Sequence, residues 1–240
     1  MMIAIGNFFF RYRNFLFIFL YLALFIPSER IFTETTFGPH YYRYPLILGL
    51  LITFFGQLIR GLTIALAYIV RGGKDKKVYA TNLVTEGIFN HCRNPLYVGN
   101  ILMLLGVGVL INSLLFVGIF MPLFLFIYQA IVLAEENFLR QKFGTEFDNY
   151  CLHVHRWLIR PKGLLITLKS MQFKGKRWLI KEYNTQTIWL LGIVIILLFY
   201  YPQLSGNDPA RRMQVLLGAC ILLALYYLSI RYLKKSGKWA

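Results

Sequence analysis

Residues 81–99 read TNLVTEGIFNHCRNPLYVG, and after a long apolar stretch the chain continues Ala134-Glu135-Glu136. Two polar blocks, 81–97 and 135–136, thus flank residues 98–134, which are almost wholly apolar. A stretch of this length can cross a bilayer, turn and cross back, because one helical crossing needs about 20 residues. A hairpin of this kind brings both polar blocks to the same membrane face. The stretch therefore predicts a pocket at that face, built from the two ends of the hairpin.

The composition places the chain in a membrane. Its hydrophobic content of 58% and mean hydropathy of +0.56 exceed the values of soluble domains, which are about 45–50% apolar. The apolar runs are long and do not alternate with polar residues, which favours α-helices over a β-barrel. We therefore predict an all-α fold, a polytopic helical bundle with about six transmembrane helices, within residues 8–26, 46–70, 96–111, 114–134, 187–201 and 213–232.

The formal charge of +16 lies mostly in short segments between the apolar runs and in the two tails. This distribution follows the positive-inside rule, and it predicts that both termini and the pocket face the cytoplasm. Anionic lipid headgroups are the expected partners of these cations, and nucleic acid is not. The three cysteines show no framework spacing, so disulfides are not expected to organise the fold.

Three charged residues lie within or beside the apolar runs. Glu135 follows the apolar run, so we expect it to face inward, toward either a bound cation or a side chain such as Arg93. Glu136 lies four residues before Arg140, which predicts a surface ion pair. Arg60 lies inside the predicted span 46–70, where an arginine either contacts substrate or pairs within the bundle.

Two further motifs have simpler interpretations. Asn94 precedes Pro95 at the start of a predicted helix, which is typical of an N-cap. Cys151, His153 and His155 have neither of the spacings that zinc sites usually use, so we expect no metal site here.

Taken in order, these residues resemble the superfamily of isoprenylcysteine carboxyl methyltransferases and phospholipid methyltransferases. The resemblance covers residues 78–161 and rests on Leu83-Val84-Thr85-Glu86-Gly87, Arg93-Asn94-Pro95-Leu96-Tyr97-Val98-Gly99, Glu135-Glu136, Phe143-Gly144 through Tyr150, and Val154-x-Arg156 with Pro161. It implies an integral-membrane enzyme that transfers a methyl group from S-adenosylmethionine to a lipid or another membrane-soluble acceptor. The acceptor would resemble a prenylcysteine carboxylate or a phospholipid amine.

The resemblance also implies a set of cofactor-binding residues and a division of the chain. The cofactor would be held by Thr81, Asn82, Leu83, Val84, Phe89, Asn94, Pro95, Leu96, Tyr97 and Glu135. No catalytic residue is assigned, and Arg93 and Arg60 are the candidates. The N-terminal membrane helices would occupy residues 1–77, the cofactor-binding core 78–161, and a basic linker with two further helices 162–240.

Two positions depart from the family pattern. The usual histidine before proline is Asn94, as in members that methylate phospholipids. The arginine that carboxyl-methylating members carry four residues before the first glutamate is Ile131, which disfavours a carboxylate acceptor. The alternative function is an NADPH-dependent membrane reductase of the sterol-reductase type, whose members need more basic residues for the extra phosphate. The adjacent glutamates favour the methyltransferase.

Overall fold

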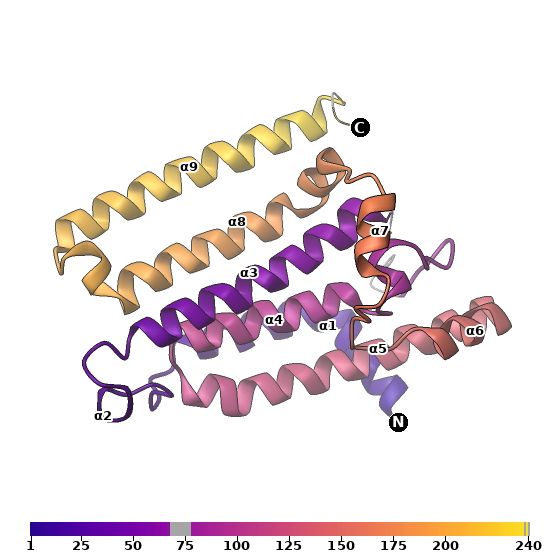
Figure 1. Ribbon diagram of the computed structural model, residues 1–240, viewed down its shortest axis with the longest axis horizontal. Coiled ribbons are helices and arrows are strands. Elements are labelled where there is room, and N and C mark those ends of the chain that lie inside the picture. Colours follow the sequence, from indigo (N-terminus) through magenta and orange to yellow (C-terminus); the bar gives the residue numbers. More distant parts are fainter. Residues whose placement is uncertain (68–77, 238, 240) are drawn as a thin grey trace. The chain divides into compact units, whose positions relative to one another are not determined.

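The computed structural model describes residues 1–67, 78–237 and 239, and within them every regular element is a helix (Figure 1). The chain forms two compact units, Met1–Phe173 and Lys174–Ala240. The first unit therefore contains both the predicted N-terminal helices and the predicted core. The last three residues of the predicted span 46–70 lie outside the described residues.

The first unit is built from long apolar helices that end in short polar elements. Its elements are α1 (Met2–Leu22), η1 (Ala23–Phe25), α2 (Glu34–Phe37), α3 (Arg43–Leu66), η2 (Gly87–Asn90), α4 (Pro95–Leu110), η3 (Phe116–Phe120), α5 (Met121–Phe143), α6 (Thr145–His153) and α7 (Leu164–Ser170). Helix α3 packs along α4, and α1 packs along α5. The tight turn predicted between the third and fourth spans is present at Asn112, which has a φ of 60°.

The second unit, Lys174–Ala240, is a pair of long helices. Helix α8 (Gly175–Tyr200) and helix α9 (Pro209–Lys235) are joined through η4 (Pro202–Ser205). The Asp208 side chain accepts a hydrogen bond of 2.9 Å from the Ala210 backbone N–H and so caps the start of α9. Within the helix pair, Tyr226 donates to the Gln186 side chain. Helix α8 begins twelve residues before the apolar run at 187, because polar residues extend the helix beyond its apolar part.

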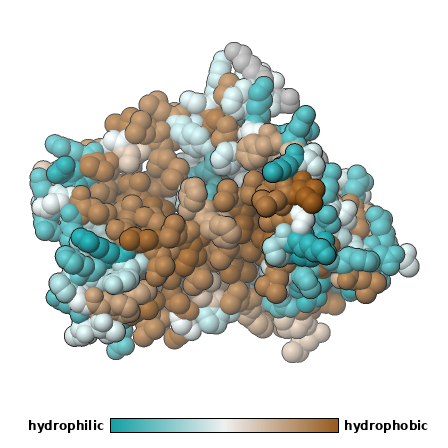
Figure 2. Space-filling model, viewed as in Figure 1, coloured by the Kyte–Doolittle hydropathy of each residue, from teal (hydrophilic) through white to brown (hydrophobic). Residues whose placement is uncertain are grey.

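The all-α polytopic class is confirmed. Among the described residues, four helices are long and apolar enough to span a membrane: Arg43–Leu66, Phe116–Phe143, Gly175–Tyr200 and Pro209–Lys235. The bent pair Met2–Arg13 and Phe15–Phe25 would be a fifth span, and Pro95–Leu110 is a shorter apolar helix. Figure 2 shows hydrophobic side chains over the middle of the helices and hydrophilic ones at their ends, as a bilayer requires.

Glycines let α3 and α4 approach closely. A Cβ added at Gly106 would lie 2.3 Å from the Thr53 backbone nitrogen, and one added at Gly56 would lie 2.6 Å from the Gly99 carbonyl oxygen. The Thr53 hydroxyl donates to the Met103 carbonyl across this contact, at 3.2 Å. Small residues at such contacts allow the dispersion attraction between backbones that holds membrane helices together.

We expect Gly106→Ala to lower the free energy of unfolding by about 1–3 kcal/mol, because the new methyl group forces α3 and α4 apart. Gly118→Ala is the matched control, since nothing lies within 4 Å of a Cβ built there. The two variants can be compared by their thermal unfolding midpoints in detergent. Equal midpoints would show that the α3–α4 contact relaxes without cost.

Candidate functional site

A cavity of about 390 Å³ opens at the end of the first unit where α3 ends, α4 begins and α5 leaves the apolar run. All ten residues that the family resemblance implied as cofactor-binding line this cavity: Thr81, Asn82, Leu83, Val84, Phe89, Asn94, Pro95, Leu96, Tyr97 and Glu135. Both catalytic candidates, Arg60 and Arg93, line it as well. The hairpin of α4 and α5 thus brings the two polar blocks together, as predicted.

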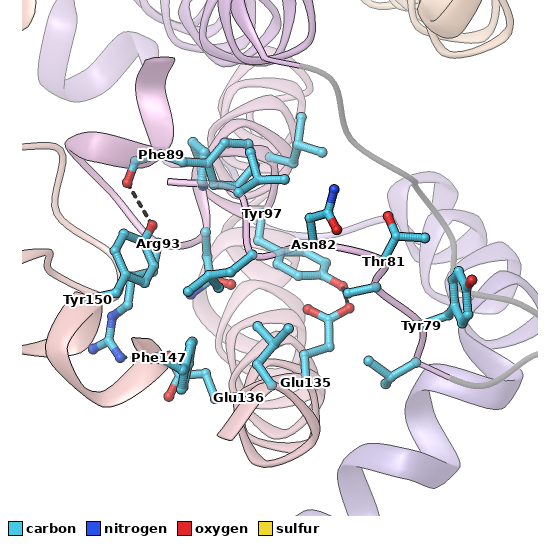
Figure 3. Close-up of a pocket in the computed structure, with 18 of the residues that line it drawn as sticks. Tyr79, Thr81, Asn82, Phe89, Arg93, Tyr97, Glu135, Glu136, Phe147 and Tyr150 are labelled. Atoms are coloured by element: carbon cyan, nitrogen blue, oxygen red, sulfur yellow. Dashed lines mark hydrogen bonds and ion pairs between the residues drawn. The ribbon is translucent and has the colours of Figure 1, made fainter. Parts of the chain in front are cut away.

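Glu135 and Tyr97 meet across the hairpin. The Tyr97 hydroxyl donates a hydrogen bond of 2.8 Å to the Glu135 carboxylate (Figure 3). The Tyr97 ring packs against the Tyr128 ring, with centroids 5.2 Å apart, and against a buried cluster of Phe10, Ile127 and Ile131. This packing fixes the ring, so the carboxylate is held at the cavity wall by a rigid donor.

The predicted surface pair of Glu136 and Arg140 is wrong. Glu136 is buried, with 5% of its surface exposed, and its carboxylate lies 3.2 Å from Arg93 Nη1 and 2.7 Å from Arg156 Nη2. Arg140 instead pairs with Asp148 at 2.7 Å, where both side chains are about half exposed. The helical spacing along α5 suggested Arg140. Instead, the loop before α4 brings Arg93 to Glu136, and the loop after α6 brings Arg156.

Arg156 completes this ion-pair cluster by holding Glu136 with two hydrogen bonds. Its Nε donates at 2.9 Å and its Nη2 at 2.7 Å, in the bidentate geometry that suits a guanidinium. The Glu136 carboxylate raises the pKa of Arg156 through these hydrogen bonds. We call Arg93, Glu136 and Arg156 the ion-pair cluster. It joins α5 to the loop before α4, which lines the cavity, and to the loop after α6.

Those two loops run along each other. The Arg93 backbone N–H donates to the His155 carbonyl at 2.9 Å, and the Arg160 N–H donates to the His91 carbonyl at 3.0 Å. Asn94 occupies the N-cap position of α4, but its side chain makes no cap hydrogen bond. Its amide donates instead to the Arg156 carbonyl at 3.2 Å. The prediction that the Asn94 side chain caps α4 is therefore wrong, because its amide instead joins the two loops.

Aromatic side chains form one side of the cavity. Phe89 on η2 and Tyr150 on α6 both line it, and the Tyr150 hydroxyl donates to the Phe89 carbonyl at 2.6 Å (Figure 3). Burial raises the pKa of Tyr150, so the phenol stays protonated and remains a donor. Phe147, buried on the same helix, packs beside Tyr150 with ring centroids 6.3 Å apart. A planar ring can lie against such a wall.

Arg60 lies at the deeper part of the site. It is buried on α3, with 6% of its surface exposed, and its guanidinium donates to the Asn100 side chain on α4. Both residues line the cavity. Arg60 therefore has a partner within the bundle and also lines the cavity, and its contact with substrate stays a prediction.

Several residues that line the cavity were not predicted from the sequence to bind a ligand. They include Arg13, Tyr79, Asn100, Phe147 and Tyr150. Arg13 comes from α1, which is distant in sequence and was assigned only to a span. Phe147 and Tyr150 lie in the Phe143–Tyr150 motif, and their aromatic character at a spacing of three residues could have placed them on one helix face.

Cys92, Cys151 and His153 each contact a neighbouring polar group. Burial raises the pKa of the Cys92 thiol to about 11, and the thiol donates to the Arg156 carbonyl at 3.5 Å. Cys151 accepts a hydrogen bond from Arg93 at 2.8 Å, and His153 contacts the Asn149 carbonyl at 2.9 Å. Within the described chain, no three His, Cys, Asp or Glu side chains lie where they could share a metal ion.

A family model and two plant relatives point to the same group of methyltransferases. A family model described as phospholipid methyltransferase matches residues 44–146. Two proteins of Oryza sativa, from the indica and japonica subspecies and each named "Probable protein-S-isoprenylcysteine O-methyltransferase", are 30% identical over 145 residues. This match covers 57% of the present chain and 74% of each rice protein.

Two bacterial relatives carry other names. The nickel-cobalt-cadmium resistance protein NccN of Alcaligenes xylosoxydans xylosoxydans is 27% identical over 117 residues, 49% of this chain and 53% of that protein. The cobalt-zinc-cadmium resistance protein CzcN of Cupriavidus metallidurans is 29% identical over 119 residues, 48% of this chain and 51% of that protein. The chain spans about half the length of these two relatives. No solved structure matches it.

Proposed function

Because the chain belongs to the superfamily of isoprenylcysteine and phospholipid methyltransferases, we propose that it is an integral-membrane enzyme that methylates a lipid or membrane-soluble acceptor with S-adenosylmethionine. The observation that carries this proposal is the cavity itself, which collects Glu135, Tyr97 and the residues 81–84 at one end of a membrane hairpin. The cavity of about 390 Å³ falls within the range of small-molecule sites, about 300–1,000 Å³.

The residues present fit the cofactor by charge. S-adenosylmethionine supplies an electrophilic methyl group on a cationic sulfonium, and it also carries an amine and a carboxylate. Glu135 presents a carboxylate to the cavity and would attract the cationic groups. Arg93 lines the cavity, and its Nε–H is buried without a hydrogen-bond partner among the described residues. That donor would suit a carboxylate oxygen.

The residues also fit by shape. The aromatic wall of Phe89, Phe147 and Tyr150 would receive the adenine ring. Tyr97 would hold the Glu135 carboxylate in place while the methyl group moves. Because methyl transfer is an in-line displacement, these residues would contribute by orienting the reactants and by excluding water.

The acceptor and the membrane orientation belong to the same proposal. A lipid acceptor would reach the cavity from the bilayer, past the deeper residues Arg60 and Asn100. The cofactor would enter from the aqueous side, which we take to be the cytoplasm because most Lys and Arg residues lie in the segments on that side. Arg60 and Arg93 remain candidates for contacting the acceptor.

The deciding experiment is the thermal stability of the purified chain in detergent with S-adenosylhomocysteine or with NADPH. A ligand at about 100 times its dissociation constant stabilises the folded state by about 2.7 kcal/mol. We expect a rise in the unfolding midpoint with S-adenosylhomocysteine and none with NADPH. A rise with NADPH and none with S-adenosylhomocysteine would favour the NADPH-dependent reductase over the methyltransferase.

We expect Tyr97→Phe to weaken S-adenosylhomocysteine binding by about tenfold, because the variant keeps the packed ring and loses the donor to Glu135. Tyr12→Phe is the control, since Tyr12 is exposed on α1 and outside the cavity lining. Calorimetric titration of both variants measures the difference. An unchanged affinity for Tyr97→Phe would show that Glu135 does not need this donor.

A further inference from the structure

The segment from Leu158 to Lys169 exposes apolar and basic side chains together, outside the membrane-spanning helices. Leu158, Leu165 and Ile166 have 74%, 71% and 73% of their surface exposed. Arg160, Lys162 and Lys169 are exposed among them, and no acidic residue occurs between Asp148 and Glu182. Water disfavours the exposed apolar side chains, and the bilayer core disfavours the cations. The boundary between them accommodates both.

This segment lies at the same end of the first unit as the cavity. Helix α7 stands beside η2, near the end of α3 (Figure 1). The contacts between α7 and η2 are specific. The His91 ring lies 2.9 Å from the Arg160 carbonyl through Nδ1 and 2.9 Å from the Thr167 hydroxyl through Nε2. Because a carbonyl only accepts, Nδ1 donates, and in the neutral ring Nε2 accepts from Thr167.

A second contact joins the same elements. The sulfur of Met171, just after α7, would lie 3.6 Å from a Cβ added at Gly87, so it packs on the first residue of η2. Element η2 also carries Phe89, which lines the cavity. Thr167 and Met171 therefore connect α7 to the element that carries part of the cavity wall.

We propose that the segment 158–170 binds the anionic leaflet of the membrane and thereby holds η2, and with it the cavity wall, in place. The charge of the segment favours this partner. Its exposed cations have no acidic neighbours in sequence, and anionic headgroups attract them. Its exposed leucine and isoleucine side chains enter the headgroup boundary. The inference adds regulation by lipid charge to the proposed function, but the contacts that carry it do not depend on which cofactor binds.

The test is hydrogen–deuterium exchange of the full chain in nanodiscs of phosphatidylcholine, with or without phosphatidylglycerol. One cation near an anionic surface changes association by about fivefold. We expect exchange at residues 158–170 and at 87–91 to slow by about that factor or more in the anionic nanodiscs. The double variant K162Q/K169Q should lose most of this response. The control R211Q/R212Q removes two exposed cations at the start of α9 and should keep it.

Two more variants separate anchoring from coupling. L165E/I166E should abolish the response in both segments, because glutamate opposes insertion next to anionic headgroups. Thr167→Val should keep the response at 158–170 and reduce it at 87–91, because it removes the hydroxyl that meets His91 while the Met171 contact remains. Equal exchange in both kinds of nanodisc would overturn the proposal and indicate that protein covers this surface. Because no cofactor is added, failure of the proposed function leaves these results unaffected.

Discussion

Replacing Glu136 with alanine is expected to lower the free energy of unfolding by about 3–5 kcal/mol, the usual cost of removing one partner from a buried ion pair. The carboxylate lies between Arg93 and Arg156 at 3.2 and 2.7 Å, and only 5% of the residue is exposed. Its removal leaves two guanidinium groups facing each other without the anion. The loops at 91–94 and 155–160 then lose their anchor on α5.

Asp148→Ala provides the comparison, because it breaks the ion pair with Arg140, in which both side chains are about half exposed. Such pairs contribute about 0–1 kcal/mol. Thermal unfolding in detergent, without any ligand, should separate the two variants clearly. Glu136→Gln should fall between Glu136→Ala and the unmodified chain, since the amide oxygen still accepts from Arg156. If Glu136→Ala unfolds at the same temperature as Asp148→Ala, the ion-pair cluster does not hold the loops.

The contrast between the two glutamates shows what the sequence could and could not predict. Adjacent helix positions point about 100° apart, so the sequence indicated that the two carboxylates have different surroundings. It placed Glu135 facing inward, and the structure has Glu135 at the cavity beside Tyr97. For Glu136 the helical spacing suggested Arg140. The true partners, Arg93 and Arg156, come from loops whose positions depend on tertiary packing.

The same distinction applies to the fold. Apolar runs predicted which segments enter the membrane, because the bilayer imposes a length and composition on each span. They did not predict where helices begin and end, since α8 starts at Gly175 and α5 continues to Phe143, through polar residues beyond the apolar runs. The contribution of Arg13 to the cavity was also beyond the sequence, because it depends on α1 packing against α5.

Replacing Glu135 with alanine is expected to weaken S-adenosylhomocysteine binding by about 2–5 kcal/mol, or roughly 30-fold to several thousandfold, while the protein stays folded. The Tyr97 hydroxyl donates to this carboxylate, and Arg13, which also lines the cavity, attracts it electrostatically. Removing the carboxylate leaves a hydroxyl at the cavity wall and a partly exposed Arg13, whereas Glu136 lies against two cations at 3.2 and 2.7 Å. The unfolding temperature without ligand should change much less than for Glu136→Ala.

Calorimetric titration in detergent measures the affinity, and Glu146→Ala serves as the matched control because Glu146 is an exposed carboxylate on α6, outside the cavity lining. Glu135→Gln should recover part of the loss if the carboxylate acts as a hydrogen-bond acceptor, and none if its charge attracts the ligand. The two carboxylates of α5 thus have separable roles: Glu136 should govern stability without ligand, and Glu135 should govern affinity. A Glu135→Ala protein that binds S-adenosylhomocysteine as tightly as the unmodified chain would remove the cavity from the proposed mechanism.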